Sequence, residues 1–200
     1  YGSDDGYWVA VGGTVIATAT DPTATWTSRA NPFTVLILEI ARGSDGYCVA
    51  VGFTGEIATA TDPTSTWTLR ANPFGTSDIL GVAYGNGVWV AVGADGKIAT
   101  ATDPTATWTL RTSGVTSDLQ GAAYGNATWV VVGDGGILLT ATDPTSTWTL
   151  RANPSGGQVL RGVAYAAGWI VAGFFSTILT ARYPTATWQR VPLPFNDGTH

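Results

Sequence analysis

The stretch Thr-Ala-Thr-Asp-Pro-Thr-Ala-Thr-Trp at residues 100–108 recurs in close variants along the 200-residue chain, and it decides the fold. A tryptophan closes each copy, every 40 or 41 residues. These tryptophans are Trp26, Trp67, Trp108, Trp148 and Trp188. A second series of tryptophans has the same spacing and comprises Trp8, Trp89, Trp129 and Trp169. In the second unit Cys48 stands at the position of this tryptophan. Self-similarity at a fixed period identifies a repeat protein, so the architecture follows from one unit.

The third unit predicts what each repeat forms. We expect strands at Asp78–Tyr84, Val88–Gly93, Lys97–Thr102 and Thr107–Arg111, because Gly, Asn and Asp in the intervening turns tolerate positive φ. Four short antiparallel strands in one repeat are one blade of a β-propeller. The sequence therefore predicts an all-β fold, a β-propeller of about five four-stranded blades that occupies residues 1–200 as a single domain. The predicted repeat units are about 1–42, 43–84, 85–124, 125–165 and 166–200.

The units are offset by one strand at the ends of the chain. Tyr1-Gly2 corresponds to Tyr84-Gly85, the end of an innermost strand, so the first unit begins without that strand. We therefore count four innermost strands and five of each other kind. Pro192 and Pro194 make residues 191–200 a poor substitute, because proline cannot donate to a ladder. We expect a fragment of a longer chain; a closed five-blade ring and an open arc of a larger ring are the alternatives.

Composition narrows the possible functions. Only 12% of the residues are charged and the net charge is −5, so the chain lacks the clustered basic residues that nucleic acid requires. No apolar run of about 18 residues is present, and we expect no membrane insertion. Cys48 is the only cysteine, and isolated acidic turns such as Asp95-Gly96 and Asp134-Gly135 supply one carboxylate each. We predict neither a metal site nor a cofactor.

The turn between the third and fourth strands of each unit resembles the Asp box of bacterial neuraminidase repeats, Ser/Thr-x-Asp-x-Gly-x-Thr-Trp. Alanine replaces the leading Ser/Thr, threonine replaces the glycine, and Tyr183 replaces the aspartate in the last unit. An aspartate here can accept hydrogen bonds from turn N–H groups while the tryptophan packs over the hairpin. Copies on every blade cannot all lie at one active site. We therefore predict a structural role for Asp21, Trp26, Asp62, Trp67, Asp103, Trp108, Asp143, Trp148 and Trp188.

The whole unit, with Tyr-Gly-Asn-Gly-x-Trp-Val-Ala-Val-Gly before the Asp-box-like turn, is also similar to repeats of phage tail or head fibres and of secreted bacterial surface proteins. Photosystem assembly-factor propellers are similar in build too. The resemblance to fibre and surface-protein repeats implies an extracellular or virion-surface location. Shared folds do not by themselves imply shared function.

Catalytic residues are scarce. One arginine recurs at the same slot in four units, and Glu39 and Glu56 are the only glutamates. Glu39 and Arg42 replace the Gly and Tyr of the innermost strand and bring charge near the presumed axis, on opposite faces of the strand. We predict no catalytic residue. The alternative is a fragment of an Asp-box glycosidase, sialidase-like, with its catalytic residues outside this segment.

Loops that lead into the innermost strands contain Asn-Pro-Phe motifs, which offer a candidate binding surface. Aromatic rings beside amides could stack on sugars, with repetition around a ring adding avidity. These candidate ligand-binding residues are Asn31, Phe33, Asn72, Phe74 and Asn153. In the alternative interpretation proline stiffens the loop and phenylalanine joins adjacent blades. We expect a non-enzymatic scaffold or binding module whose partners are a glycan, a protein receptor or neighbouring structural subunits.

Overall fold

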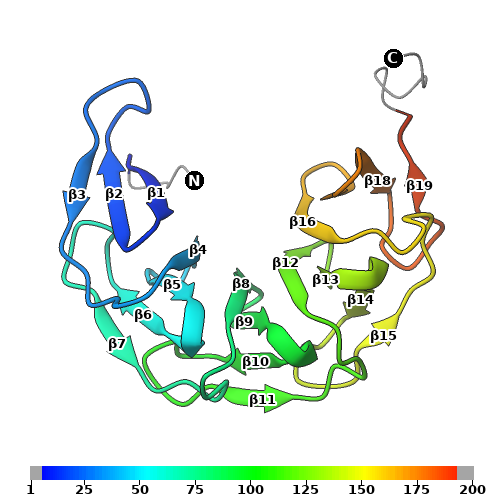
Figure 1. Ribbon diagram of the computed structural model, residues 1–200, viewed down its shortest axis with the longest axis horizontal. Coiled ribbons are helices and arrows are strands. Elements are labelled where there is room, and N and C mark those ends of the chain that lie inside the picture. The colour runs from blue at the N-terminus through cyan, green and yellow to red at the C-terminus, as the bar shows by residue number, and fades with distance from the viewer. Residues whose placement is uncertain (1–5, 193–200) are drawn as a thin grey trace.

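The computed structural model describes residues 6–192, which form five antiparallel sheets, or blades, in chain order. Blade 1 has three strands in the described part of the chain, and blades 2 to 5 have four each. Figure 1 shows the blades side by side along an open arc, with blades 1 and 5 at its two ends. The prediction of an all-β propeller fold with about five blades is confirmed.

In each blade the strands run from the concave side of the arc outward in chain order (Figure 1). Blade 1 contains β1 (Trp8–Gly12), β2 (Val15–Ala19) and β3 (Thr27–Arg29). Blade 2 contains β4 (Ile37–Arg42), β5 (Cys48–Gly52), β6 (Ile57–Ala60) and β7 (Thr68–Arg70). Blade 3 contains β8 (Ile79–Gly85), β9 (Val88–Gly93), β10 (Ile98–Ala101) and β11 (Thr109–Arg111). Blade 4 contains β12 (Leu119–Gly125), β13 (Thr128–Gly133), β14 (Leu138–Ala141) and β15 (Thr149–Leu150). Blade 5 contains β16 (Leu160–Tyr165), β17 (Trp169–Gly173), β18 (Thr177–Ala181) and β19 (Gln189–Arg190).

The strands of blade 3 match the four predicted strands to within two residues. Over residues 6–192 there are four innermost strands and five of each other kind, as the repeat offset predicted. Most of the proline-containing segment 191–200 lies outside the described residues. The described blades form an arc and not the closed ring that the sequence left open, and membership of a longer chain stays a prediction.

The core lies between blades rather than within them. Each blade has a trailing face, directed at the next blade in the chain, and a leading face, directed at the preceding one. Between blades 3 and 4, the trailing face of blade 3 presents Val90, Val92 and Ile98 to the leading face of blade 4, which includes Trp129 and Trp148. Equivalent clusters lie between the other neighbours. The second strand is apolar on both faces because two blades cover it.

Close approach of the blades depends on glycine at the end of the innermost strands β8 and β12. A Cβ atom on Gly85 would overlap the ring of Tyr124, and one on Gly125 would overlap Tyr165. Each of these tyrosines also packs on a tryptophan of its own blade, and the Tyr124 and Trp129 ring centroids are 5.1 Å apart. The Tyr-Gly dipeptide therefore sets the spacing of the blades on the concave side.

The repeated arginine fixes the outermost strand to its neighbour. Its Nε donates a 2.8 Å hydrogen bond to a threonine Oγ1 on the third strand of the same blade. The pairs are Arg29 with Thr18, Arg70 with Thr59, Arg111 with Thr100 and Arg151 with Thr140. All four threonines are buried, so the bond satisfies a hydroxyl that is removed from water.

Candidate functional site

Each innermost strand carries a β-bulge at the same point, and the bulges define a site on the concave face. The pairing register shifts between Ile37 and Glu39 in blade 2, and at the equivalent step in the other three strands. A bulge leaves one residue out of the ladder and re-aims its side chain. The four extra residues line one hollow of about 440 Å³ together with Glu39 and Phe53. They are Leu38, Leu80, Gln120 and Arg161.

A chain of hydrogen bonds orders the basic end of this concave hollow. Arg161 Nη1 donates to Gln120 Oε1 at 2.5 Å, and Gln120 Nε2 donates to Asp134 Oδ1 at 2.8 Å. The Arg161 guanidinium carbon also lies 4.8 Å from the centroid of the Phe174 ring. A guanidinium has five N–H donors, so an arginine held in this way can present further donors to a ligand.

The other end of the concave hollow holds a carboxyl group whose charge is set by its surroundings. Burial raises the pKa of Glu39 to about 7, and the hydrogen bond from the Val82 N–H works in the opposite direction. Val82 N donates to Glu39 Oε2 at 3.0 Å, and a Cβ on Gly81 would lie 3.1 Å from the same oxygen. Glycine in the next blade therefore makes room for the carboxyl, which exchanges its proton near neutral pH.

The structure separates the two charges that the sequence placed near the axis. Glu39 lines the concave hollow, whereas Arg42 Nη1 donates to Cys48 Sγ at 3.2 Å. Cys48 is buried between blades 1 and 2 at the position of the repeated tryptophan. Only Glu39 of this pair belongs to the candidate site.

The Asn-Pro-Phe loops differ from the exposed aromatic surface that their sequence suggested. Phe33 and Phe74 are only 7% and 2% exposed, because both rings insert into the clusters between blades. Neither ring can stack on a sugar in this position. The Oδ1 atoms of Asn31, Asn72 and Asn153 accept hydrogen bonds from the backbone N–H two residues later. The alternative interpretation, in which phenylalanine joins adjacent blades, describes these loops.

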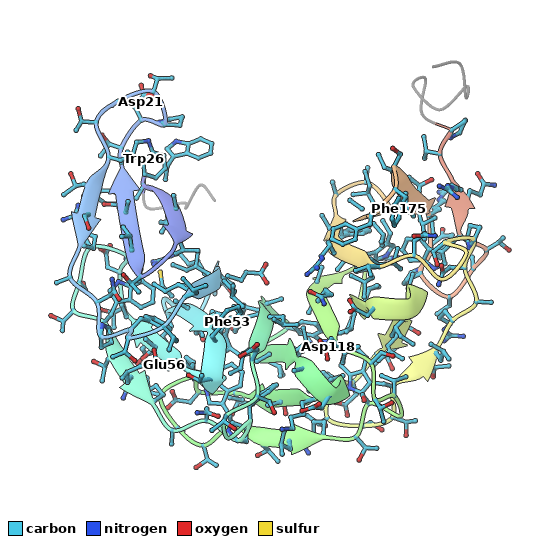
Figure 2. The ribbon with its side chains drawn as sticks, viewed as in Figure 1. Asp21, Trp26, Phe53, Glu56, Asp118 and Phe175 are labelled. Atoms are coloured by element: carbon cyan, nitrogen blue, oxygen red, sulfur yellow. The ribbon has the colours of Figure 1, made fainter. Side chains whose placement is uncertain are left out.

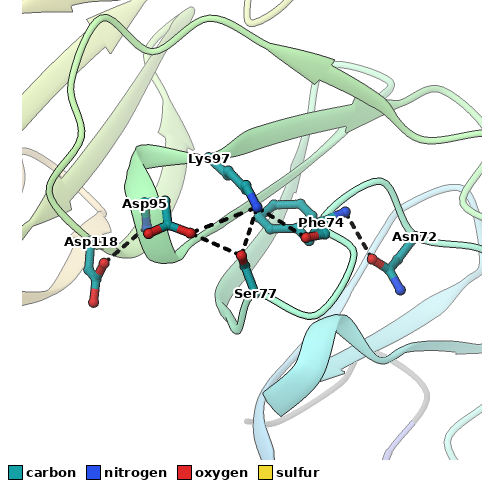
Figure 3. A network of polar contacts seen from close by, with 6 residues as sticks. All are labelled: Asn72, Phe74, Ser77, Asp95, Lys97 and Asp118. Atoms are coloured by element: carbon teal, nitrogen blue, oxygen red, sulfur yellow. Dashed lines mark hydrogen bonds and ion pairs between the residues drawn. The ribbon is translucent and has the colours of Figure 1, made fainter.

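The loops that lead into blades 3 and 4 make polar contacts with the turn between β9 and β10 of blade 3. Lys97 Nζ donates to the Phe74 carbonyl oxygen at 3.1 Å and to Ser77 Oγ at 2.7 Å, both in the loop before blade 3 (Figure 3). Asp118, in the loop before blade 4, accepts from the Asp95 N–H at 3.0 Å. Asp95 has a φ of 59°, so this contact supports a strained turn. The Lys97 contacts fix the loop that enters blade 3, and the Asp118 contact joins blade 3 to the loop before blade 4.

The Asp-box-like turns have the contacts expected of a structural element. Asp103 Oδ1 accepts hydrogen bonds from Thr105 N at 2.8 Å and Thr105 Oγ1 at 2.7 Å, and Trp108 Nε1 donates to the Pro104 carbonyl oxygen at 3.2 Å. The bonds between aspartate and threonine recur in all four turns. The hydrogen bond from the threonine hydroxyl is the main cause that lowers the pKa of the aspartate in each.

These lowered pKa values predict acid sensitivity. A carboxyl whose folded pKa lies below its unfolded value stabilises the protein above the unfolded value, 3.8 for aspartate, and the contribution is lost as pH falls through the folded pKa. We expect the free energy of unfolding, measured by urea titration, to fall below about pH 4. Replacing all four aspartates by asparagine should flatten this decline, and an unchanged slope would contradict the assignment. The variant replaces Asp21, Asp62, Asp103 and Asp143.

No protein-family model matches the sequence, and no curated protein matches it. Solved structures do. Virginiamycin B lyase from Staphylococcus aureus matches with a TM-score of 0.84 over 98% of this chain and 70% of its own, at 14% identity. YCF48 from Cyanidioschyzon merolae matches with a TM-score of 0.69 over 96% of this chain and 69% of its own, at 14% identity. YCF48 bound to a D1 peptide gives 0.65 over 92% and 63%, at 17% identity. The fold is a β-propeller. Identities this low establish the fold alone, and the Asp-box resemblance stays a prediction.

In this propeller the two glutamates have separate surroundings. Glu39 lines the concave hollow, whereas Glu56 accepts hydrogen bonds from Thr34 N at 3.2 Å and Thr34 Oγ1 at 2.8 Å in an exposed loop contact. Glu56 does not line the concave hollow. Over residues 6–192 no three His, Cys, Asp or Glu side chains gather as a metal site would require. No helix within that range is long and apolar enough to cross a membrane.

Proposed function

We propose that this propeller is a non-enzymatic binding module that holds a peptide segment of a partner protein in its concave hollow. One observation carries the proposal: four successive blades each place a bulge residue in the same hollow. Bulges are frequent next to binding and active sites because they redirect single side chains without disturbing the sheet. The bulge residue differs between blades, so the side chains from four blades together form one surface that a ligand can contact.

The chemistry of the concave hollow favours a peptide with a carboxylate next to an apolar side chain. Arg161 is exposed, and its guanidinium geometry suits a carboxylate. Leu38, Leu80 and Phe53 are half-buried and supply apolar contact. YCF48 is a propeller of related fold that has been solved with a peptide bound, which supports the class of ligand.

The setting of the module is a further part of the proposal. We infer a scaffold or receptor-binding role on the exterior of a virion or cell, because the repeat resembles those of phage fibres and secreted bacterial surface proteins. Neighbouring structural subunits would then be natural sources of the peptide. A glycan ligand is the competing outcome, and the sialidase-like glycosidase is the enzymatic alternative.

A binding screen tests the proposal. We expect acidic peptides with a neighbouring apolar residue to bind in a peptide array, and Arg161→Ala to weaken that binding about tenfold or more, since it removes a charge-assisted hydrogen bond. Arg190→Ala, an exposed arginine on the outer strand of the same blade, is the matched control and should bind like the wild type. Equal losses in both variants would contradict the site.

Two further measurements separate the alternatives. Binding on a glycan array with no peptide signal would replace the peptide ligand by a sugar. Hydrolysis of a fluorogenic sialoside or glucoside by this chain would overturn the non-enzymatic assignment.

A further inference from the structure

The concave hollow holds two charged side chains that come from different blades and do not pair. Glu39 lies on β4 of blade 2, and Arg161 lies on β16 of blade 5. Blades 3 and 4 stand between them (Figure 1) and contribute Leu80 and Gln120 to the same hollow. Arg161 donates to Gln120, and within residues 6–192 no ion pair joins it to Glu39. The two charges are therefore separate elements of one site.

One oxygen of the Glu39 carboxyl group is fixed and the other is open. Oε2 accepts the hydrogen bond from Val82 N, and Gly81 leaves room for it. Oε1 has no hydrogen-bond partner within residues 6–192, and it is not one of the fully buried polar atoms without a partner in that range. The bond from blade 3 therefore orients the carboxyl group, while Oε1 stays accessible to a ligand in the hollow.

The strands around Glu39 supply no positive charge. In the described part of the chain, β4 packs mainly against β1, β5 and β8, and none of these strands contains Lys or Arg. Their titratable side chains are Cys48, which accepts from Arg42 of β4, and Tyr84, which packs on Trp89. An ionised carboxylate that is partly removed from water is stabilised by a cation close to it. A bound ligand can supply that cation.

We propose that Glu39 is a second specificity-determining residue of the concave hollow and binds an ammonium group of the same peptide whose carboxylate meets Arg161. This inference rests on the proposed peptide-binding function. Leu38 and Leu80 then contact the apolar side chain between the two charges. The hollow selects a peptide with a lysine and an acidic residue on either side of an apolar one, because a peptide with the acidic group alone leaves Glu39 without a counter-charge.

The proton equilibrium of Glu39 makes this preference depend on pH. Burial raises the pKa of Glu39 to about 7, so the carboxyl group is mostly protonated at pH 6 and mostly ionised at pH 8. An ammonium group favours the ionised form, so binding of a lysine peptide releases a proton from Glu39 near neutral pH. The affinity for such a peptide follows the ionised fraction and rises about tenfold from pH 6 to pH 8.

A matched pair of peptides tests the proposal. Both have blocked termini and a leucine between a basic and an acidic position, in a series with different spacings between the charges. One has lysine at the basic position, and the other has acetyl-lysine, which lacks the charge. We expect fluorescence anisotropy to show about tenfold tighter binding of the lysine peptide at pH 8, and this advantage to disappear at pH 6. Glu39→Gln should remove the advantage at both pH values, because an amide does not ionise.

Glu56→Gln is the matched control, because Glu56 does not line the hollow. Figure 2 shows Phe53 on the concave side of blade 2 and Glu56 farther out on the same blade. The control should keep the lysine preference, whereas Arg161→Ala should weaken the binding of both peptides alike. Circular dichroism of each variant confirms that it folds.

The outcomes separate this inference from the function on which it rests. Equal binding of the two peptides at pH 8, with a loss of binding in Arg161→Ala, would overturn the role of Glu39 and leave peptide binding in place. A lysine preference that survives Glu39→Gln would do the same. No binding of any peptide in the series would overturn both proposals.

Discussion

Replacing Trp89 by alanine should lower the free energy of unfolding by about 3–5 kcal/mol, the cost of a large cavity in a packed core. The indole is fully buried between blades 2 and 3, and its Nε1 donates to Asp45 Oδ2 at 2.7 Å. The change therefore removes both packing and a hydrogen bond that crosses the interface. Chemical denaturation followed by circular dichroism measures the loss.

The repeat supplies a matched control at Trp8, which occupies the same position in blade 1. Trp8→Ala should cost less than about 1 kcal/mol, because much of this side chain is exposed when the leading face is uncovered. Similar costs at both positions would contradict the difference in exposure between Trp8 and Trp89.

Replacing Glu39 by glutamine should stabilise the protein at pH 8 by about 1–3 kcal/mol and change little at pH 4. The folded pKa of Glu39 is raised from 4.5 to about 7, so its contribution to stability is fully present below pH 4.5 and is lost as pH rises through 7. Glutamine cannot ionise, so the variant avoids that loss. Urea titrations of both proteins between pH 4 and pH 8 test the difference.

Glu56→Gln is the matched control for this experiment, because Glu56 hydrogen-bonds to Thr34 at an exposed contact. We expect no comparable gain in stability for the control as pH rises. A gain at Glu39 that is constant across the pH range would show that removal of the charge is not its cause.

Much of the fold could be predicted from the sequence, because the same strand and turn patterns recur in each repeat. The turns at Gly85 and Asp95 and the count of four innermost strands over residues 6–192 could be predicted from residue types and register. The burial of Phe33 and Phe74 could not, since a Phe after Pro in a loop has the same sequence whether its ring packs inward or outward. Whether the ring packs inward depends on the distance to the neighbouring blade.

The concave hollow was harder to predict for a different reason. A bulge changes the direction of one side chain without changing the apolar pattern around it, so nothing in a single repeat marks Leu80 or Gln120 as directed toward the axis. One signal was present: this slot varies from leucine to glutamine and arginine while its neighbours stay nearly constant. Arg161 lies outside the slot in which arginine recurs, but its contact with Gln120 could be found only from coordinates.

Because the core lies between blades, blades 2, 3 and 4 each share one interface with either neighbour within residues 6–192. Stability in such an array is close to a sum over the blades and their nearest-neighbour interfaces. Because each blade packs mainly on its neighbours, the number of blades can change during evolution. Duplicating one repeat adds a blade together with the interface that receives it, and no other part of the chain has to change.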